Sequence, residues 1–171
     1  MIQYVFSDKV IPRVQNRFAA MAVLSNEWGQ AITTPSYLLS GVSSAVNFKY
    51  SEAQEWVNEL PHRMEKDRYP FLFINASTVK YRGDVCTIGE LVIATLSNEE
   101  WGADARERHN INPILRNLKD LVVEAIDVFF ATDRPFEPEY EYVYNALRST
   151  DFKDDIDAVV LRNIKLRIIK C

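Results

Sequence analysis

Residues 111–126, INPILRNLKDLVVEAI, carry the strongest structural signal in this chain. Apolar residues recur in this stretch at intervals of three and four, which predicts a helix with one broad apolar face. Asn112 suits the position before a first helical turn and Pro113 suits the first helical position, so we expect the helix to begin there. Such a face must be buried, most simply across a β-sheet. The apolar positions are Ile114, Leu115, Leu118, Leu121, Val122, Ala125, Ile126 and Phe129.

Two apolar segments before this helix are predicted to be paired strands. The segment 84–96, DVCTIGELVIATL, is rich in β-branched residues, which favours a central strand. The segment 69–76, YPFLFINA, is aromatic and apolar, and Gly83 allows a turn between the two. We therefore expect an antiparallel pair. Glu90 is a lone carboxylate in the second strand, and it either lies on an exposed face or edge or pairs with an Arg or Lys across the sheet or an interface.

The chain after the helix carries two further strand patterns. Three tyrosines alternate with other residues over 140–145, which suits a strand, although a short helix fits the same segment. In the closing segment 157–170, apolar residues alternate with Lys165 and Arg167, which is typical of a half-exposed strand. Arg162 and Asn163 interrupt this alternation, so we expect a bulge there.

The first part of the chain contributes two predicted helices and a long loop. Residues 8–24 carry an apolar face at helical spacing. Residues 28–48 then form an uncharged loop with a short strand around 37–39, and a loop of that length usually has a function. Ser51 has the capping-box spacing to Gln54 and is predicted to open the second helix.

Together these elements predict an α+β fold. We expect a small, mostly antiparallel sheet packed by one long amphipathic helix, with two further helices near the N-terminus. The 171 residues suit a single domain, 1–171, in which 28–65 would be an insertion. A chain of this length buries enough surface to fold without a disulfide or a metal.

Charge and composition narrow the function classes. Twenty basic and 24 acidic residues are interspersed, for a net charge of −4. This balance argues against general phosphate binding and sequence-specific nucleic-acid binding, but it leaves room for a local basic patch inside a larger assembly. The longest uncharged stretch, 28–48, is too polar to span a bilayer, and the start of the chain lacks the apolar core of a secretory signal. Two cysteines, Cys86 and Cys171, favour a reducing compartment.

Residues that could carry chemistry are sparse in the sequence. His62 and His109 are the two histidines, and neither has the neighbours that a zinc site needs. Cys86 lies in an apolar run, which predicts a buried, inert thiol. No serine lies in a G-x-S-x-G motif, and the five glycines form no phosphate-binding loop. We therefore expect a protein that is not an enzyme and that has no cofactor or metal.

Two loops are the candidate interfaces. The loop 28–48 lacks charge and contains large apolar residues, so we expect it either to be covered by a partner or to fold back on its own domain. The charged segment 97–112 contains Trp and Arg residues, which are enriched in binding hot spots. The suspected interface residues are Trp28, Tyr37, Leu38, Leu39, Trp101, Arg106 and Arg108.

The order of these segments resembles a family of virion proteins. A strand (DVCTIGELVIATL), a charged loop (EEWGADARERHN), a helix (INPILRNLKDLVVEAI) and a closing strand (AVVLRNIKLRII) follow one another. This order is similar to that of the tail terminator and neck-ring (head–tail connector) proteins of tailed bacteriophages, including the neck rings of crAss-like phages. The resemblance covers roughly 8–25 and 70–170, and it rests on element order and helix character instead of an invariant motif.

The resemblance implies a structural role in the virion, with assembly in the host cytoplasm. The chain would be a subunit of a homo-oligomeric ring at the phage neck or tail end, which joins or terminates head and tail. Its partners would be copies of itself and neighbouring neck, portal or tail proteins. A ring of one chain uses heterologous contacts, so each subunit needs two different adhesive surfaces, for which we expect 28–48 and 97–112.

Two other function classes fit the same sequence. A small-molecule-binding α+β module would have a deep apolar pocket lined by Tyr and Trp, with convergent polar groups. A monomeric adaptor or inhibitor would bind one other protein and would stay monomeric at high concentration.

Overall fold

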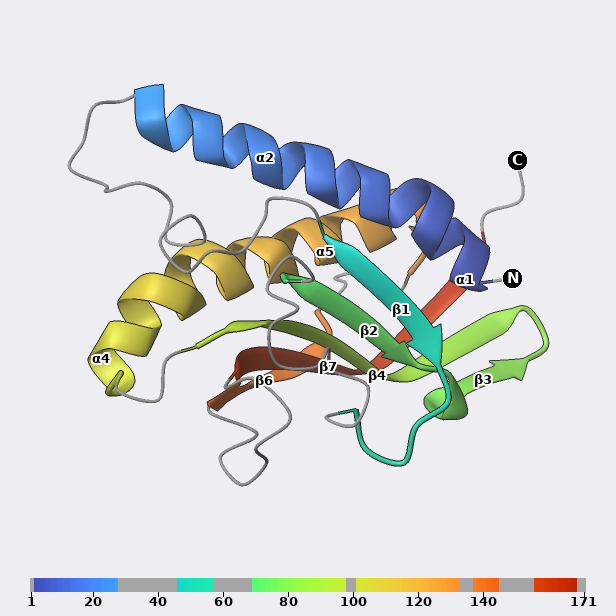
Figure 1. Ribbon diagram of the computed structural model, residues 1–171. Helices are drawn as coiled ribbons and strands as arrows, with labels where there is room; N and C mark the ends of the chain where they lie inside the picture. Colours follow the sequence, from blue (N-terminus) through green and yellow to red (C-terminus); the bar gives the residue numbers. More distant parts are fainter. Residues whose placement is uncertain are drawn as a thin grey trace.

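Two long helices lie against one side of a curled, mixed β-sheet in the computed structural model (Figure 1). The structure describes residues 2–27, 46–56, 69–97, 101–132, 137–144 and 156–168. The predicted α+β class is confirmed over these residues. The second long helix on the sheet is a difference from the predicted single one.

The sheet has seven described strands in the order β1-β2-β4-β7-β5, with β3 also paired to β4 and β6 also paired to β7. β1 runs parallel to β2, which makes the sheet mixed, and the remaining described pairings are antiparallel. The strands predicted over 69–76, 84–96 and 157–170 correspond to β2, β4 and β7. The strand alternative for 140–145 is confirmed as β6. The bounds are β1 Asn47–Ser51, β2 Phe71–Asn75, β3 Val79–Arg82, β4 Val85–Leu96, β5 Phe130–Ala131, β6 Glu139–Tyr144 and β7 Ile156–Ile168.

Both helices begin earlier than the sequence predicts. The first runs through α1 (Ile2–Val5), a π-helical stretch (Phe6–Val10) and α2 (Ile11–Glu27). The second runs through α4 (Ala103–Arg106), a π-helical stretch (Glu107–Arg116) and α5 (Asn117–Phe129). Asn112 therefore lies inside this helix, and the predicted cap at that residue is wrong.

Proline explains why the sequence placed both helix starts too late, and it accounts for the π-helical stretches. A proline within a helix has no N–H to donate, and its ring crowds the carbonyl four residues earlier. The widened hydrogen bonding of a π stretch changes which carbonyl faces that position. One π stretch directly precedes Ile11 and Pro12, where the Ile11 N–H bonds to the Phe6 carbonyl. The other includes Pro113. Proline thus lies inside each helix, where the sequence suggested a beginning.

β1 replaces part of the predicted N-terminal insertion. Ser51 is the last residue of β1, so the helix predicted to open there is wrong at its start. Residues 52–56 are not α-helical either, and residues 47–48 of the predicted loop belong to β1. The predicted helix from 57 onward, the loop over 28–45 and the short strand around 37–39 lie outside the described residues. Asn75, which is 2% exposed, fixes the chain after β1. Its Oδ1 accepts from the Ala53 N–H at 3.2 Å, and its Nδ2 donates to the Ala53 carbonyl at 3.0 Å.

The sheet is interrupted along one line that crosses three strands. The 3-10 turn Ala76–Thr78 separates β2 from β3. In β4 and β7 the line passes through Gly89 and Asn163, and Asn163 has the left-handed φ of 54°. Ile88 pairs with Ile164 and Glu90 with Arg162, so the register is unchanged across the interruption. The bulge predicted at Arg162 and Asn163 is therefore wrong in kind. β4 and β7 are both interrupted there, but neither strand has an extra residue.

This line changes which side chains face the helices. Tyr81 lies opposite Cys86, and its hydroxyl accepts from the Ile2 N–H at 3.4 Å, so Cys86 and Ile88 face the N-terminal helix. Asp157 faces the other helix, as described below, and Thr95 opposite it shares that face with Ile93 and Leu91. Ile88 and Leu91 are three residues apart instead of two. The alternation of a regular strand therefore shifts by one at Gly89.

The shift divides the sheet into two halves. In the half formed by β1, β2, β6 and the adjoining parts of β4 and β7, both faces of the central strands are buried. In the other half, formed by β3, β5 and the remaining parts of β4 and β7, the side away from the helices carries exposed residues. The central buried runs are Leu91–Leu96 of β4 and Ile156–Leu161 of β7.

Gly89 occupies a position with no room for a side chain. A Cβ there would lie 2.8 Å from the Thr78 Cβ and 3.2 Å from the Thr78 carbonyl oxygen. We expect Gly89→Ala to lower the free energy of unfolding by about 1–3 kcal/mol, because the turn and β4 would have to separate. Urea denaturation measures this loss.

Gly102→Ala is the matched control for this substitution. A Cβ at Gly102 meets no heavy atom within 4 Å. We expect its stability to change by no more than about 0.5 kcal/mol, as for most surface substitutions. Equal losses for the two variants would show that the close approach at Thr78 does not restrict position 89.

Candidate functional site

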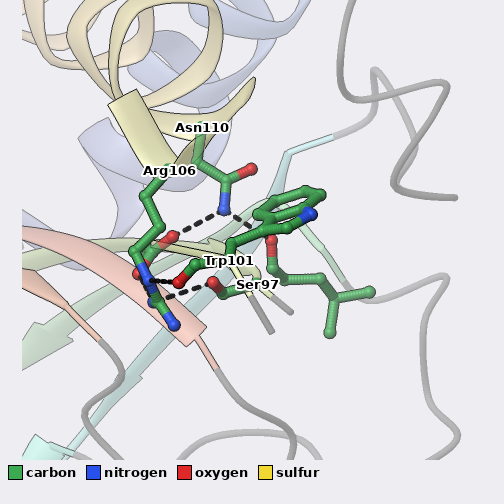
Figure 2. Close-up of polar contacts among 6 residues, drawn as sticks. Ser97, Trp101, Arg106 and Asn110 are labelled. Carbon is green, nitrogen blue, oxygen red and sulfur yellow. Dashed lines mark hydrogen bonds and ion pairs between the residues drawn. The ribbon is translucent and has the colours of Figure 1, made fainter. Parts of the chain in front are cut away.

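A buried polar cluster ties the second helix to β7 (Figure 2). Arg106 is 4% exposed, and its guanidinium pairs with the Asp157 carboxylate at 2.5 Å. The same guanidinium donates to the Ser97 hydroxyl at 2.9 Å and to the Trp101 carbonyl at 3.0 Å. A buried charge is costly unless it is paired and hydrogen-bonded, and here both conditions are met.

Asn110 completes the cluster from the next turn of the helix. Its Nδ2 donates to the second Asp157 oxygen at 2.7 Å and to the Leu96 carbonyl at 2.9 Å. Leu96 ends β4, and Asp157 lies at the start of β7. The cluster therefore sets the height and rotation of the helix over the two central strands. Its role among the described residues is structural.

The suspected interface residues have four different outcomes. Arg106 points inward to Asp157 and offers little surface to a partner, which the sequence did not reveal. Trp101 is half-buried, and its carbonyl accepts from Arg106. Arg108 lies in the π-helical stretch, but its side chain is outside the description. The remaining four, which are Trp28, Tyr37, Leu38 and Leu39, lie outside the described residues, so their interface role stays a prediction.

The structure instead assembles four cations on one face of the sheet. Lys80 lies opposite Thr87 of β4, and Thr87 lies opposite Lys165 of β7. In the next row, Arg82 lies opposite Val85, and Val85 lies opposite Arg167. Directly opposed residues in antiparallel strands point to the same side. We call Lys80, Arg82, Lys165 and Arg167 the basic sheet face.

The basic sheet face is open to solvent. Tyr81 points to the helix side, so its neighbours Lys80 and Arg82 point away from the helices. All four cations are exposed, and Arg167 is balanced by Asp84 at 3.7 Å. Within the described part of the chain, the other three cations form no ion pair. With strands about 4.8 Å apart, the cations lie about 7–10 Å from one another, close to the screening length in physiological salt.

A groove borders this face. Its volume is about 210 Å³, and it lies between β5 and the ends of β4 and β7. Two cations of β7 and the hydroxyl of Thr132, which follows β5, thus line a concave region together with apolar residues. The lining residues are Val85, Ala131, Thr132, Lys165, Leu166 and Arg167.

The opposite edge of the sheet is acidic. Glu137, Glu139 and Glu141 precede or belong to β6, and all three are exposed; we call them the acidic edge. Glu141 pairs with Arg162, and Glu139 accepts from Asn163 Nδ2 at 3.4 Å. Part of this edge lines a groove of about 450 Å³ between α5 and the start of β6.

The tyrosines of β6 point the other way. The Lys119 ammonium lies 3.9 Å from the centre of the exposed Tyr140 ring, and Tyr140 meets Tyr142 edge to face at 5.8 Å. Lys119 belongs to α5, so these rings face the helices. Glu139 and Glu141 alternate with them and therefore point to the side away from the helices. By this alternation Glu139 and Glu141 share that side of the sheet with the basic sheet face, whereas Glu137 precedes β6 and lines the groove beside α5.

Two further residues that the sequence singled out, Glu90 and Cys86, differ in their burial and in their contacts. Glu90 is half-buried, and its Oε1 accepts from Asn75 Nδ2 at 3.2 Å, while its cross-strand neighbour Arg162 pairs with Glu141. Cys86 is 1% exposed, and burial raises the pKa of its thiol. Its predicted burial is confirmed.

Among the described residues no group of three or more His, Cys, Asp or Glu side chains could hold a metal ion. None of the described helices is both long and apolar enough to cross a membrane.

Sequence reasoning missed the basic sheet face because its members are far apart in the chain. The Lys-x-Arg patterns at 80–82 and 165–167 are each visible in the sequence. Only the strand pairings with β4 bring the two patterns into adjacent rows. The cations at 165–167 alternate within a predicted strand, whereas those at 80–82 lie in the segment that the sequence placed between two strands and that the structure shows as β3.

The buried ion pair makes Arg106 a sensitive position. We expect Arg106→Met to lower the free energy of unfolding by about 3–5 kcal/mol, because it leaves the Asp157 carboxylate buried and uncompensated. Urea denaturation followed by circular dichroism measures the change. The double variant Arg106→Met/Asp157→Asn removes that charge and keeps an acceptor for Asn110, so it should be more stable than the single variant. A double variant as unstable as the single one would contradict this account.

The raised pKa of Cys86 predicts slow thiol chemistry. In a Cys171→Ser background, we expect native Cys86 to react with a disulfide reagent at mildly alkaline pH at least about tenfold more slowly than the same chain in concentrated urea. Both burial and the small thiolate fraction reduce the rate. Equal rates in the two conditions would count against the buried position of the thiol.

No protein-family model, no curated protein and no solved structure matches this chain. The resemblance to phage ring proteins therefore stays a prediction from element order.

Proposed function

We propose that this chain is a structural virion protein. It would be a subunit of a homo-oligomeric ring at the neck or tail end of a tailed bacteriophage, where it joins or terminates head and tail. Its neighbours in the virion would be neck, portal or tail proteins. The chain would act by binding and positioning other proteins instead of by catalysis.

The element order gives the first support. A helix over 2–27 is followed by β2, β3 and β4, then by the helix over 103–129, and β7 closes the described chain. This order, a strand followed by a helix and then a returning strand, is the order on which the resemblance rests, and β7 pairs with β4. Both helices lie on one side of the sheet (Figure 1), and in the half formed by β3, β5 and the adjoining parts of β4 and β7 the other side carries exposed residues.

The observation that carries the proposal is the separation of charge on the sheet. The basic sheet face reaches β3, which pairs with β4, whereas the acidic edge follows β6, which pairs with β7 on its other side. A ring of identical subunits needs two different and complementary surfaces on each copy. Exposed surfaces of opposite charge at opposite edges of one sheet meet that requirement. The segments 28–48 and 97–112 stay further proposed contact regions.

The oligomeric state tests this function directly. We expect light scattering on purified protein to show a mass that rises with concentration toward a closed ring of several subunits, with rings in negative-stain images of the same sample. A second series in high salt is the control, because screening weakens contacts between exposed charges. A strict monomer at every concentration, with no rings in the images, would contradict the proposal and favour an adaptor.

A further inference from the structure

We infer that the basic sheet face of one copy binds the acidic edge of the next copy, so that subunits join head to tail. This inference rests on the proposed ring function and names the surfaces that would form the ring contact. It places the contact on strands β3, β4 and β7 of one subunit and on β6 of its neighbour.

The β3 part of the basic sheet face and the acidic edge lie at opposite edges of the same sheet, whereas Lys165 and Arg167 lie on the central strand β7. β3 pairs with β4 on the side where β2 also pairs, and β6 pairs with β7 on the far side. Within the ranges that the structure describes, no strand covers the outer edge of β3 or of β6. An uncovered edge offers unpaired backbone groups to another chain. One copy can therefore use both surfaces at once without using the same residues twice.

The charges match in orientation as well as in sign. Lys80 and Arg82 are two residues apart on β3 and point away from the helices, as shown by Tyr81 between them. Glu139 and Glu141 are also two residues apart and point to the same side. When β3 and β6 of two copies lie side by side, cations and carboxylates recur at the same spacing of about 7 Å. The helices of both copies then stay on a common side.

The charge distribution also favours a second copy over a nucleic acid. Lys80, Arg82 and Lys165 are exposed, and they form no ion pair with another described residue. A phosphate backbone would satisfy them too, but it would be repelled by the acidic edge that points to the same side of the sheet. The chain itself supplies three exposed carboxylates on that edge, in every copy.

Charge reversal and mixing test this inference on the full chain. One variant reverses the basic sheet face (Lys80→Glu, Arg82→Glu and Lys165→Glu) and a second reverses the acidic edge (Glu137→Lys and Glu139→Lys). Arg167 and Glu141 are retained because each already has an internal ion-pair partner. All these positions are exposed, so both variants should fold, which circular dichroism checks.

The expected result is a change of assembly that depends on the mixture. Each variant alone should lose at least about tenfold in self-association by light scattering, because like charges meet at every contact. A mixture of the two should associate again into alternating assemblies, because the unchanged basic face meets the unchanged acidic edge and the two reversed surfaces also meet with opposite charge. A variant with both reversals should associate again. Lys9→Glu, an exposed reversal on the N-terminal helix, should associate like the unaltered chain.

The other outcomes separate the possible failures. If the unaltered chain forms rings that both reversed variants also form, the ring function stands and the inference about its surfaces is wrong. If the unaltered chain is monomeric in every condition, the proposed function fails together with the inference. If only the basic-face variant changes behaviour, through lost binding to a labelled DNA duplex, the occupant is a nucleic acid and the inference is overturned.

Discussion

The ladder between β4 and β7 is the constraint on which the other elements depend. Its register is constant from Val85 opposite Arg167 to Leu96 opposite Ile156. β2 and β3 pair with the free side of β4, and β5 and β6 pair with the free side of β7. The second helix is held to the same pair, through Asp157 and the Leu96 carbonyl. A slip of one residue in this ladder would turn the core face to solvent and separate the polar cluster.

Within this frame, the interruption at Gly89 and Asn163 decides where solvent-exposed charges lie. The alternation of β4 shifts there, so Cys86 and Ile88 still face the helices after the strand has bent. Their neighbours in the same strand then point away from the helices, as do Lys165 and Arg167 across the ladder. One local change in strand geometry thus separates the two halves of the sheet. One half has a polar face, and the other half is buried on both faces. The exposed half supplies the basic sheet face.

The sequence predicted the elements whose periodicity is set by burial. The strand over 84–96 and the apolar face of the later helix follow from residues that are buried in the structure. The starts of the helices could not be predicted, because Pro12 and Pro113 have the sequence signature of a first turn while the fold places them inside helices. β1 was missed because Ser51 carries a capping pattern, and parallel pairing with β2 decides the outcome. Local propensity is a weak prior that tertiary pairing overrides.

The candidate site shows the same limit at longer range. Arg106 lies in a charged segment and is of a residue type that is common at interfaces. In the fold it is buried, because it forms an ion pair with Asp157, which is distant in sequence. Lys80 and Lys165 become neighbours across Thr87 only when the ladder forms. No property of the separate segments contains this information, because it depends on which strands pair and in what register. The counts of charged residues in the sequence therefore gave the net charge of the chain, but they could not show where basic residues gather on the sheet.

Contacts between exposed charges are individually weak, so the proposed ring would need closure to hold its subunits together. A single surface ion pair contributes about 0–1 kcal/mol, and the two partners lose translational freedom on association. In a closed ring every subunit makes two contacts, and the last contact forms within one assembly, at a high effective concentration. Closure therefore stabilises a set of contacts that would not hold two subunits together for long. Because the basic sheet face and the acidic edge are separate surfaces on one sheet, each copy can make both contacts, and the charges oppose a pairing of two like surfaces.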